Sequence, residues 1–68
     1  MAETLANRLK EKRGELGLTQ AELAEAVGVT RKTVNTVENG VFVPSALLAL
    51  KLARALSLPV EELFWLED

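Results

Sequence analysis

The stretch Thr19–Gly40, TQAELAEAVGVTRKTVNTVENG, decides the fold of this 68-residue chain. Its apolar residues recur at the spacing of an amphipathic helix, and Gly28 interrupts that pattern once. The residues predicted to face the core are Leu23, Ala24, Val27, Val34 and Val37. The stretch therefore predicts two short helices that are joined by a tight turn.

Local signals mark the ends of these two helices. Thr19 followed by Glu22 has the pattern of a capping box, which satisfies backbone N–H groups at a helix start. Gly28 ends the first helix, and we expect a positive φ there because a Cβ would be strained in that conformation. Thr30 is the expected N-cap of the second helix.

The remainder of the chain also has helical patterns, so the predicted fold class is all-α, a compact bundle of five helices. Leu5, Leu9 and Leu16 share one stripe of the first helix, Ser45 caps the fourth, and Pro59 breaks the chain before the fifth. The predicted bounds are residues 4–16, 20–27, 30–38, 45–56 and 60–65, within a single domain over residues 1–68.

Two charged residues fall on apolar stripes of these helices. Arg13 continues the line of Leu5 and Leu9, and Glu38 lies beside Val34 and Val37. An isolated buried charge is costly, so each needs a partner. We predict a structural ion pair between Arg13 and Glu38, against the alternative of two solvated charges at the stripe edges.

Composition excludes several classes of protein. The chain has no Cys and no His, so neither a disulfide nor a Cys/His metal site is expected, and no cofactor is predicted. An enzyme is not expected, because there is also no Tyr and the only Asp is the last residue. The start, MAETLANRLKEKR, has no apolar run typical of a secretory signal, and no segment is long enough to span a membrane. A cytoplasmic location is therefore expected.

The second helix of the stretch has a polar and partly cationic outer face. Arg31 and Lys32 open it, and Thr33 and Thr36 follow on its polar side. An α-helix fits the major groove of B-DNA, where Arg reads guanine and Thr contacts base edges or a thymine methyl. Gln20 stands where it could reach a base or a phosphate. The plainer alternative is an ordinary solvated face of a helical bundle, since the net charge of −2 alone does not indicate nucleic acid.

The stretch resembles the Cro/repressor-type helix-turn-helix of the Xre family. The likeness runs from LKEKRGELGLTQ through VPSALLALKLARALSLPVEELF, which is nearly the whole chain. The residues that match the motif in register are Gln20, Ala24, Gly28, Val34, Val37 and the run ENG. The resemblance implies a lambda-repressor-like DNA-binding domain. Members of the family are mostly transcriptional repressors that bind palindromic operators as dimers.

The resemblance also implies roles for particular residues. Base-reading positions correspond to Arg31, Lys32 and Thr36, with Thr33 beside them and Gln20 at the edge of the site. The implied phosphate-facing residues are Thr19, Thr30 and Asn39. Arg13 and Glu38 match a charge pair of the family, in agreement with the ion pair predicted from the apolar stripes.

Three positions depart from the family pattern. Val41 stands where Lys or Arg is common, which predicts a modest affinity for phosphate. Ser57 stands at a helix end where Gly is frequent, so backbone strain is expected there. Phe42 replaces a frequent Tyr.

The C-terminal part offers a candidate surface for a homodimer. Phe64, Trp65 and Leu66 are consecutive, and one short helix cannot turn all three inward. With Leu58 they form the predicted dimer interface, because exposed apolar patches often mark association sites. The alternative is that Trp65 covers the core of its own subunit.

Three functions fit these features. The first is a transcriptional regulator, with double-stranded DNA as its partner. It would be a repressor that binds a palindromic operator in the major groove as a homodimer. The second is an antitoxin-like protein that binds a toxin and represses its own operon. The third is a protein-interaction module without DNA binding, which the cationic face of Arg31 and Lys32 disfavours.

Overall fold

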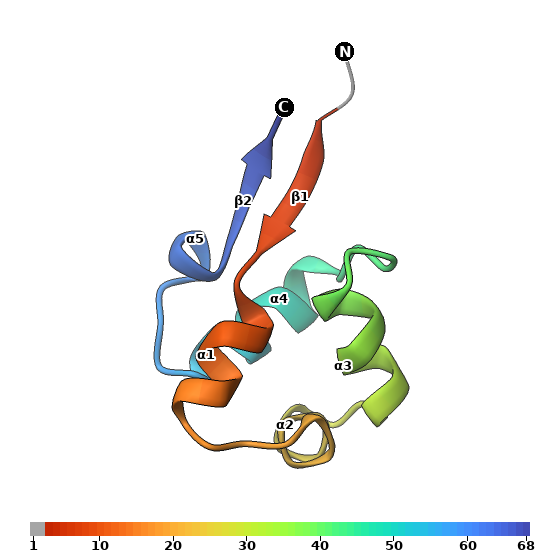
Figure 1. The fold of residues 1–68 in the computed structure, drawn as a ribbon, viewed down its shortest axis with the longest axis vertical. Helices are drawn as coiled ribbons and strands as arrows, with labels where there is room; N and C mark the ends of the chain where they lie inside the picture. The colour runs from red at the N-terminus through yellow and green to blue at the C-terminus, as the bar shows by residue number, and fades with distance from the viewer. Residues whose placement is uncertain (1–2) are drawn as a thin grey trace.

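The computed structural model describes residues 3–68, which form five helices and two short strands. In chain order the elements are β1 (Thr4–Asn7), α1 (Leu9–Glu15), α2 (Gln20–Val27), α3 (Arg31–Glu38), α4 (Ala46–Ala55), α5 (Val60–Leu63) and β2 (Phe64–Glu67). The helices gather around one core, and the two strands extend away from them (Figure 1).

The helix ends predicted from local signals are confirmed. Thr19 and Glu22 form the capping box at the start of α2, and Gly28 follows its end at φ 78°. The side chains of Thr30 and Ser45 accept hydrogen bonds from backbone N–H groups at the starts of α3 and α4. These caps are local in sequence, which is why the bounds of α2, α3 and α4 could be predicted within one residue.

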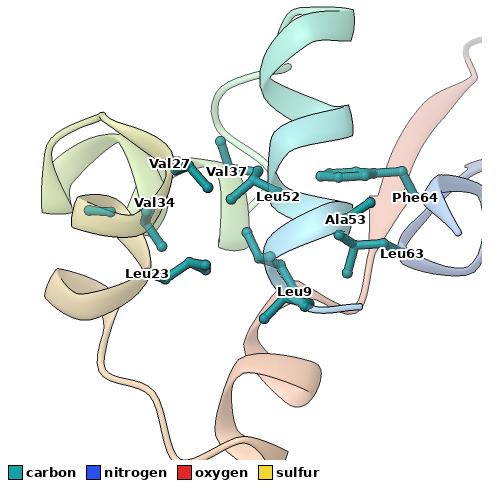
Figure 2. Packing of buried hydrophobic residues seen from close by; sticks show 11 residues of the cluster. Leu9, Leu23, Val27, Val34, Val37, Leu52, Ala53, Leu63 and Phe64 are labelled. Carbon is teal, nitrogen blue, oxygen red and sulfur yellow. The ribbon is translucent and has the colours of Figure 1, made fainter. Parts of the chain in front are cut away.

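The core draws side chains from every helix (Figure 2). The largest fully buried residues are Leu9, Leu23, Val34, Val37, Leu52 and Leu63. The prediction that Leu16 faces inward is wrong, because α1 ends at Glu15 and Leu16 is 56% exposed. Val41, which follows α3 in the chain, is also exposed, since Gly40 with its positive φ turns the chain away from the core.

The prediction of an all-α fold is corrected by the two strands. β1 and β2 pair antiparallel, with Leu5 opposite Leu66 and Asn7 opposite Phe64. Residues 4–7 are therefore not the start of a helix, and the helix predicted over 60–65 ends at Leu63. We call these paired strands the arm; it carries the C-terminus at its end (Figure 1).

Hydrogen bonds from Asn7 and Arg8 explain why the first helix starts late. The side-chain oxygen of Asn7 accepts the N–H of Leu9 at 2.9 Å and so occupies a donor at the start of α1. The N–H of Arg8 donates to the carbonyl of Leu63 at 3.1 Å, which joins β1 to the end of α5. Pairing with a strand some 60 residues away thus overrides the helical spacing of Leu5 and Leu9.

Ser57 adopts the strained conformation that its position predicted. Its φ is 58°, in the left-handed region, and it is the one residue other than glycine with positive φ in the described part of the chain. The N–H of Leu58 closes the end of α4 on the carbonyl of Ala53 at 3.0 Å. The turn after α4 therefore needs a residue in this conformation, and Gly would adopt it at lower cost.

Within residues 3–68, the helices are too short or too polar to cross a membrane.

Candidate nucleic-acid interface

The helices α2 and α3 form a helix-turn-helix. Gly28 reverses the chain, and the N–H of Val29 donates to the carbonyl of Ala24 at 3.0 Å. Ala24 is 3% exposed, and its small side chain lets the two helices pack closely. Val34 and Val37 hold the inner side of α3 against the core. This packing leaves the outer side of α3 free.

The outer side of α3 presents its cations at its first turn. Arg31 and Lys32 are exposed, whereas Thr33 and Thr36 are half-buried. The hydroxyl of Thr36 donates its hydrogen to the carbonyl of Thr33 at 2.9 Å, so its methyl group and the acceptor lone pairs of its oxygen remain for an outside contact. The structure thus places these four predicted base-reading residues on one helix, with the charged pair most accessible.

The side chains predicted to face phosphate serve as helix caps and turn contacts. The hydroxyl of Thr19 accepts the N–H of Glu22 at 3.0 Å, and that of Thr30 accepts the N–H of Thr33 at 3.2 Å. Asn39, at the end of α3, donates to Asn35 at 3.3 Å. The Thr19 hydroxyl keeps its own hydrogen for a further acceptor, because it serves as acceptor in the cap.

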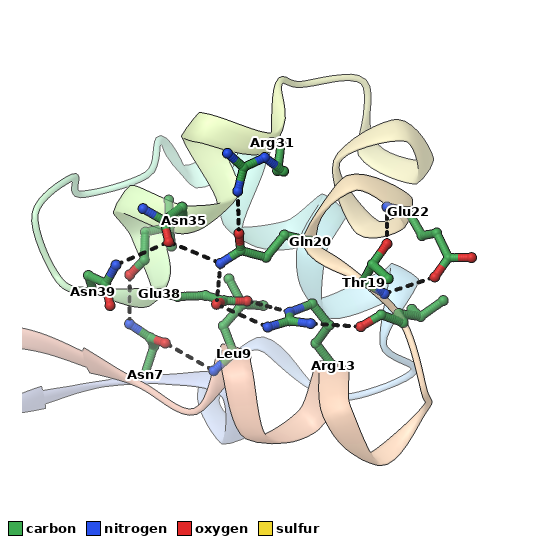
Figure 3. Close-up of polar contacts among 12 residues, drawn as sticks. Asn7, Leu9, Arg13, Thr19, Gln20, Glu22, Arg31, Asn35, Glu38 and Asn39 are labelled. Carbon is green, nitrogen blue, oxygen red and sulfur yellow. Dashed lines mark hydrogen bonds and ion pairs between the residues drawn. The ribbon is translucent and has the colours of Figure 1, made fainter.

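Gln20 sits at the centre of a polar cluster between α2 and α3 (Figure 3). Its Nε2 donates to Oδ1 of Asn35 at 3.1 Å and to Oε1 of Glu38 at 3.0 Å. Its Oε1 accepts from Nη1 of Arg31 at 3.1 Å. Sequence reasoning placed Gln20 at the edge of the site and missed these contacts, because no spacing rule pairs residues 20, 31, 35 and 38.

The ion pair predicted from the apolar stripes is present in the structure. Nε of Arg13 lies 2.6 Å from Oε2 of Glu38, and Nη2 lies 3.3 Å from Oε1. The Glu38 side chain is 2% exposed and that of Arg13 is 14% exposed. Since Arg13 neutralises the one acidic residue of α3, the charge that this helix presents outward is positive.

The four residues predicted for a dimer interface do not share one environment. Phe64 is 7% exposed and belongs to the core, which corrects its assignment to an open surface. Leu58 packs against the core, and Arg8 lies over the Trp65 ring at 4.8 Å from its centroid. Leu66 alone of the four is largely exposed, at 66%. Phe64 and Leu66 point to the same side of β2, because they are two residues apart, but Leu66 lies farther along the arm from the helices (Figure 1).

Two packed helices, a turn at a left-handed glycine and a cationic outer turn on the second helix define a helix-turn-helix DNA-binding protein. The family model described as Helix-turn-helix matches residues 9–63. The chain belongs to this family, which is the Cro/repressor or Xre type of transcriptional regulator and not a class of enzymes.

Comparison with individual proteins agrees with this assignment. The chain is 50% identical over 64 residues to the uncharacterized HTH-type transcriptional regulator YgzD of Bacillus subtilis (strain 168), covering 94% of this chain and 97% of that protein. It is 34% identical to the ImmF control region 10 kDa protein of Bacillus phage phi105, covering 81% of this chain and 61% of that protein. The crystal structure of the restriction-modification controller protein C.AhdI from Aeromonas hydrophila matches with a TM-score of 0.77 at 42% identity, covering 81% of this chain and 83% of that chain.

Proposed function

We propose that this chain is a repressor that binds a palindromic operator as a homodimer, with α3 in the major groove. The observation that carries the proposal is the first turn of α3, where Arg31 and Lys32 are exposed on a helix whose one acid is neutralised by Arg13. A chain of net charge −2 thereby offers a local cationic surface to the duplex.

Base reading falls to the residues at the start of α3. Arg31 has the fork of donors that matches O6 and N7 of guanine, and Lys32 can donate to the same acceptors. Thr33 and Thr36 follow on the same helix and offer methyl groups to thymine. Residues at the N-terminal end of a recognition helix are the ones that meet base edges in helix-turn-helix complexes.

Phosphate contacts set the register of α3 on the duplex. The backbone N–H groups at the start of α2 attract phosphate, and the hydroxyls of Thr19 and Thr30 lie at the starts of the two helices. Asn39 lies at the far end of α3 and can hold the backbone on that side. Val41 supplies no charge in the exposed loop, so the salt dependence of binding should be moderate.

Dimerisation places two copies of α3 on one face of DNA. Successive major grooves recur after about 34 Å, so a two-fold dimer reads two half-sites roughly 10 base pairs apart. Leu66 is the most exposed of the apolar residues assigned to the dimer contact, and Leu58 is partly buried against the core. One domain of this size gains little affinity from one half-site, so the second domain of the dimer, bound to the second half-site, would supply the remaining affinity.

Selection of bound sequences from a random DNA pool tests this proposal. We expect an enriched consensus with two-fold symmetry and half-sites spaced by about one helical turn. An enriched but asymmetric single site would contradict the homodimer, and no enrichment at all would contradict sequence-specific binding.

A further inference from the structure

We propose that a cavity between the helix-turn-helix and α4 is an effector site for a small carboxylate with an apolar body, and that its occupation weakens operator binding. The cavity lies between the turn at Gly28, the start of α3 and the first two turns of α4, and its volume is about 320 Å³. Sites for small molecules have volumes of about 300–1,000 Å³, so one small ligand fits. The effect on operator binding rests on the proposed function, whereas the binding of the ligand does not.

Most of the side chains that line this cavity are apolar. Val29 and Leu48 are half-buried and pack against the core, so they form a fixed part of the wall. Phe42 and Leu47 complete the wall and are 46% and 65% exposed. A ligand that covers these two side chains removes apolar surface from water, which favours binding. The cavity therefore suits a molecule with an apolar body.

Two polar groups of the cavity have hydrogen atoms to donate. Lys51 is the one charged residue that lines it, and this half-buried ammonium takes part in none of the ion pairs formed among residues 3–68. The hydroxyl of Ser45 accepts the N–H of Leu48 at 3.1 Å in the cap of α4, so its own hydrogen is free for an acceptor. A carboxylate matches this pair of donors in charge and in hydrogen bonding, whereas an ammonium group on the ligand would be repelled by Lys51.

The cavity also adjoins the proposed DNA-binding surface. Thr33 lines the cavity and is one of the residues proposed to meet base edges. The N–H groups of Val41 and Phe42 donate to the carbonyl of Thr36 at 2.9 and 3.2 Å, so the Phe42 wall is attached to α3. A carboxylate bound here neutralises Lys51 beside α3 and lowers the positive potential that attracts phosphate. The ligand and the operator should therefore weaken each other's binding by the same factor.

Titration of the free protein with octanoate, followed by NMR, tests the ligand site. We expect saturable shifts of the backbone amide signals of Val29, Thr33 and Phe42, with the signals of the arm unchanged. Hexanoate should bind roughly tenfold more weakly, because it buries two fewer CH₂ groups. The neutral 1-octanol has the same chain length without the charge, so it separates the contribution of the carboxylate from that of the apolar body.

Variants of two lining residues locate the ligand. Lys51→Met keeps an unbranched side chain without its charge, and it should weaken octanoate roughly fivefold, the size expected for a partly exposed ion pair, while 1-octanol binds as before. Lys10→Met, at an exposed position on α1, is the matched control and should leave octanoate binding unchanged. Leu47→Glu should weaken octanoate more than Leu47→Gln does, because the added carboxylate repels that of the ligand. Circular dichroism establishes that each variant is folded.

Operator binding in the presence of saturating octanoate tests the effector role. The dissociation constant for the consensus selected by the parent protein should rise roughly fivefold, and this rise should be smaller in Lys51→Met. Absence of saturable octanoate binding, or equal octanoate affinity in Lys51→Met and the parent, would overturn the site. Octanoate that binds in the cavity without changing operator affinity would overturn the effector role. If the parent selects no DNA sequence, the proposed function and the effector role both fail, and the titration of the free protein still decides whether the cavity binds a carboxylate.

Discussion

Arg13 and Glu38 join α1 to α3 through an ion pair of 2.6 Å, and the carboxylate of Glu38 is almost completely buried from solvent. The third nitrogen of the guanidinium, Nη1, donates to the carbonyl of Leu18 at 2.7 Å, so the arginine also holds the chain between α1 and α2. A buried ion pair offsets the cost of removing its charges from water only when its remaining hydrogen-bonding groups are also satisfied. The pair therefore bears on both the stability of the fold and the seating of α3.

Replacing Glu38 by Gln should lower the free energy of unfolding by about 3 kcal/mol, because the Arg13 guanidinium would stay largely buried without its counter-charge. A domain of this size has a total stability of roughly 3–10 kcal/mol, so much of it would be lost. Urea unfolding followed by circular dichroism measures the change. Glu25→Gln, on the exposed side of α2, is the control and should change stability by less than about 0.5 kcal/mol. A similar small loss in both variants would mean that the pair adds little.

Gly28→Ala should destabilise the chain by about 1–2 kcal/mol, because an L-residue is strained at its φ of 78°. A Cβ at this position meets no atom within 4 Å, so the cost is one of backbone conformation and not of packing. Gly14→Ala is the matched control, since Gly14 lies inside α1 without a positive φ and has the same open space. It should stabilise the chain by up to about 1 kcal/mol. An equal fall in the thermal unfolding midpoints of the two variants would contradict this prediction.

Ser57→Gly should raise the free energy of unfolding by about 0.5–1 kcal/mol. The left-handed conformation at φ 58° costs serine more than glycine, although glycine also gains freedom in the unfolded chain. Ser45→Ala provides the comparison: it removes the side chain that caps α4 and should cost about 1 kcal/mol. The chemical denaturation midpoints of the two variants should therefore shift in opposite directions from that of the parent. A Ser57→Gly variant that is less stable than the parent would show that glycine does not relieve the strain.

Leu66→Asp should weaken the proposed homodimer, because it places a charge in the apolar contact assigned to the arm. Sedimentation equilibrium should show a rise in the dissociation constant, with a parallel loss of affinity for a symmetric operator. Leu16→Asp is the control, as Leu16 is exposed to a similar degree after α1. A Leu66→Asp protein that dimerises as tightly as its parent would remove the arm from the interface.

Much of the fold could be predicted because its signals are local. The capping Thr19 and Thr30, the turn at Gly28 and the periodic valines of α3 each act within a few residues. The ion pair of Arg13 and Glu38 joins residues far apart in sequence, and it could be predicted because each charge lies on an apolar stripe and requires a counter-charge when buried.

The arm and the Gln20 cluster could not be predicted in this way. Residues 4–7 become a strand only because residues 64–67 lie beside them, and the spacing of Leu5 and Leu9 imitates a helix in the absence of that partner. The orientation of the Gln20 amide depends on Glu38 and Arg31 meeting it from two sides, which requires the packed structure.

Selection from a random DNA pool with the parent and the Arg31→Ala variant in parallel tests the role of α3 most directly. We expect both to enrich the same two-fold symmetric consensus, except that Arg31→Ala loses its preference at one base pair in each half-site. Its affinity for the parent consensus should also fall, by about 1–3 kcal/mol in each half-site. An identical consensus and affinity for the two proteins would contradict the reading of bases by the first turn of α3.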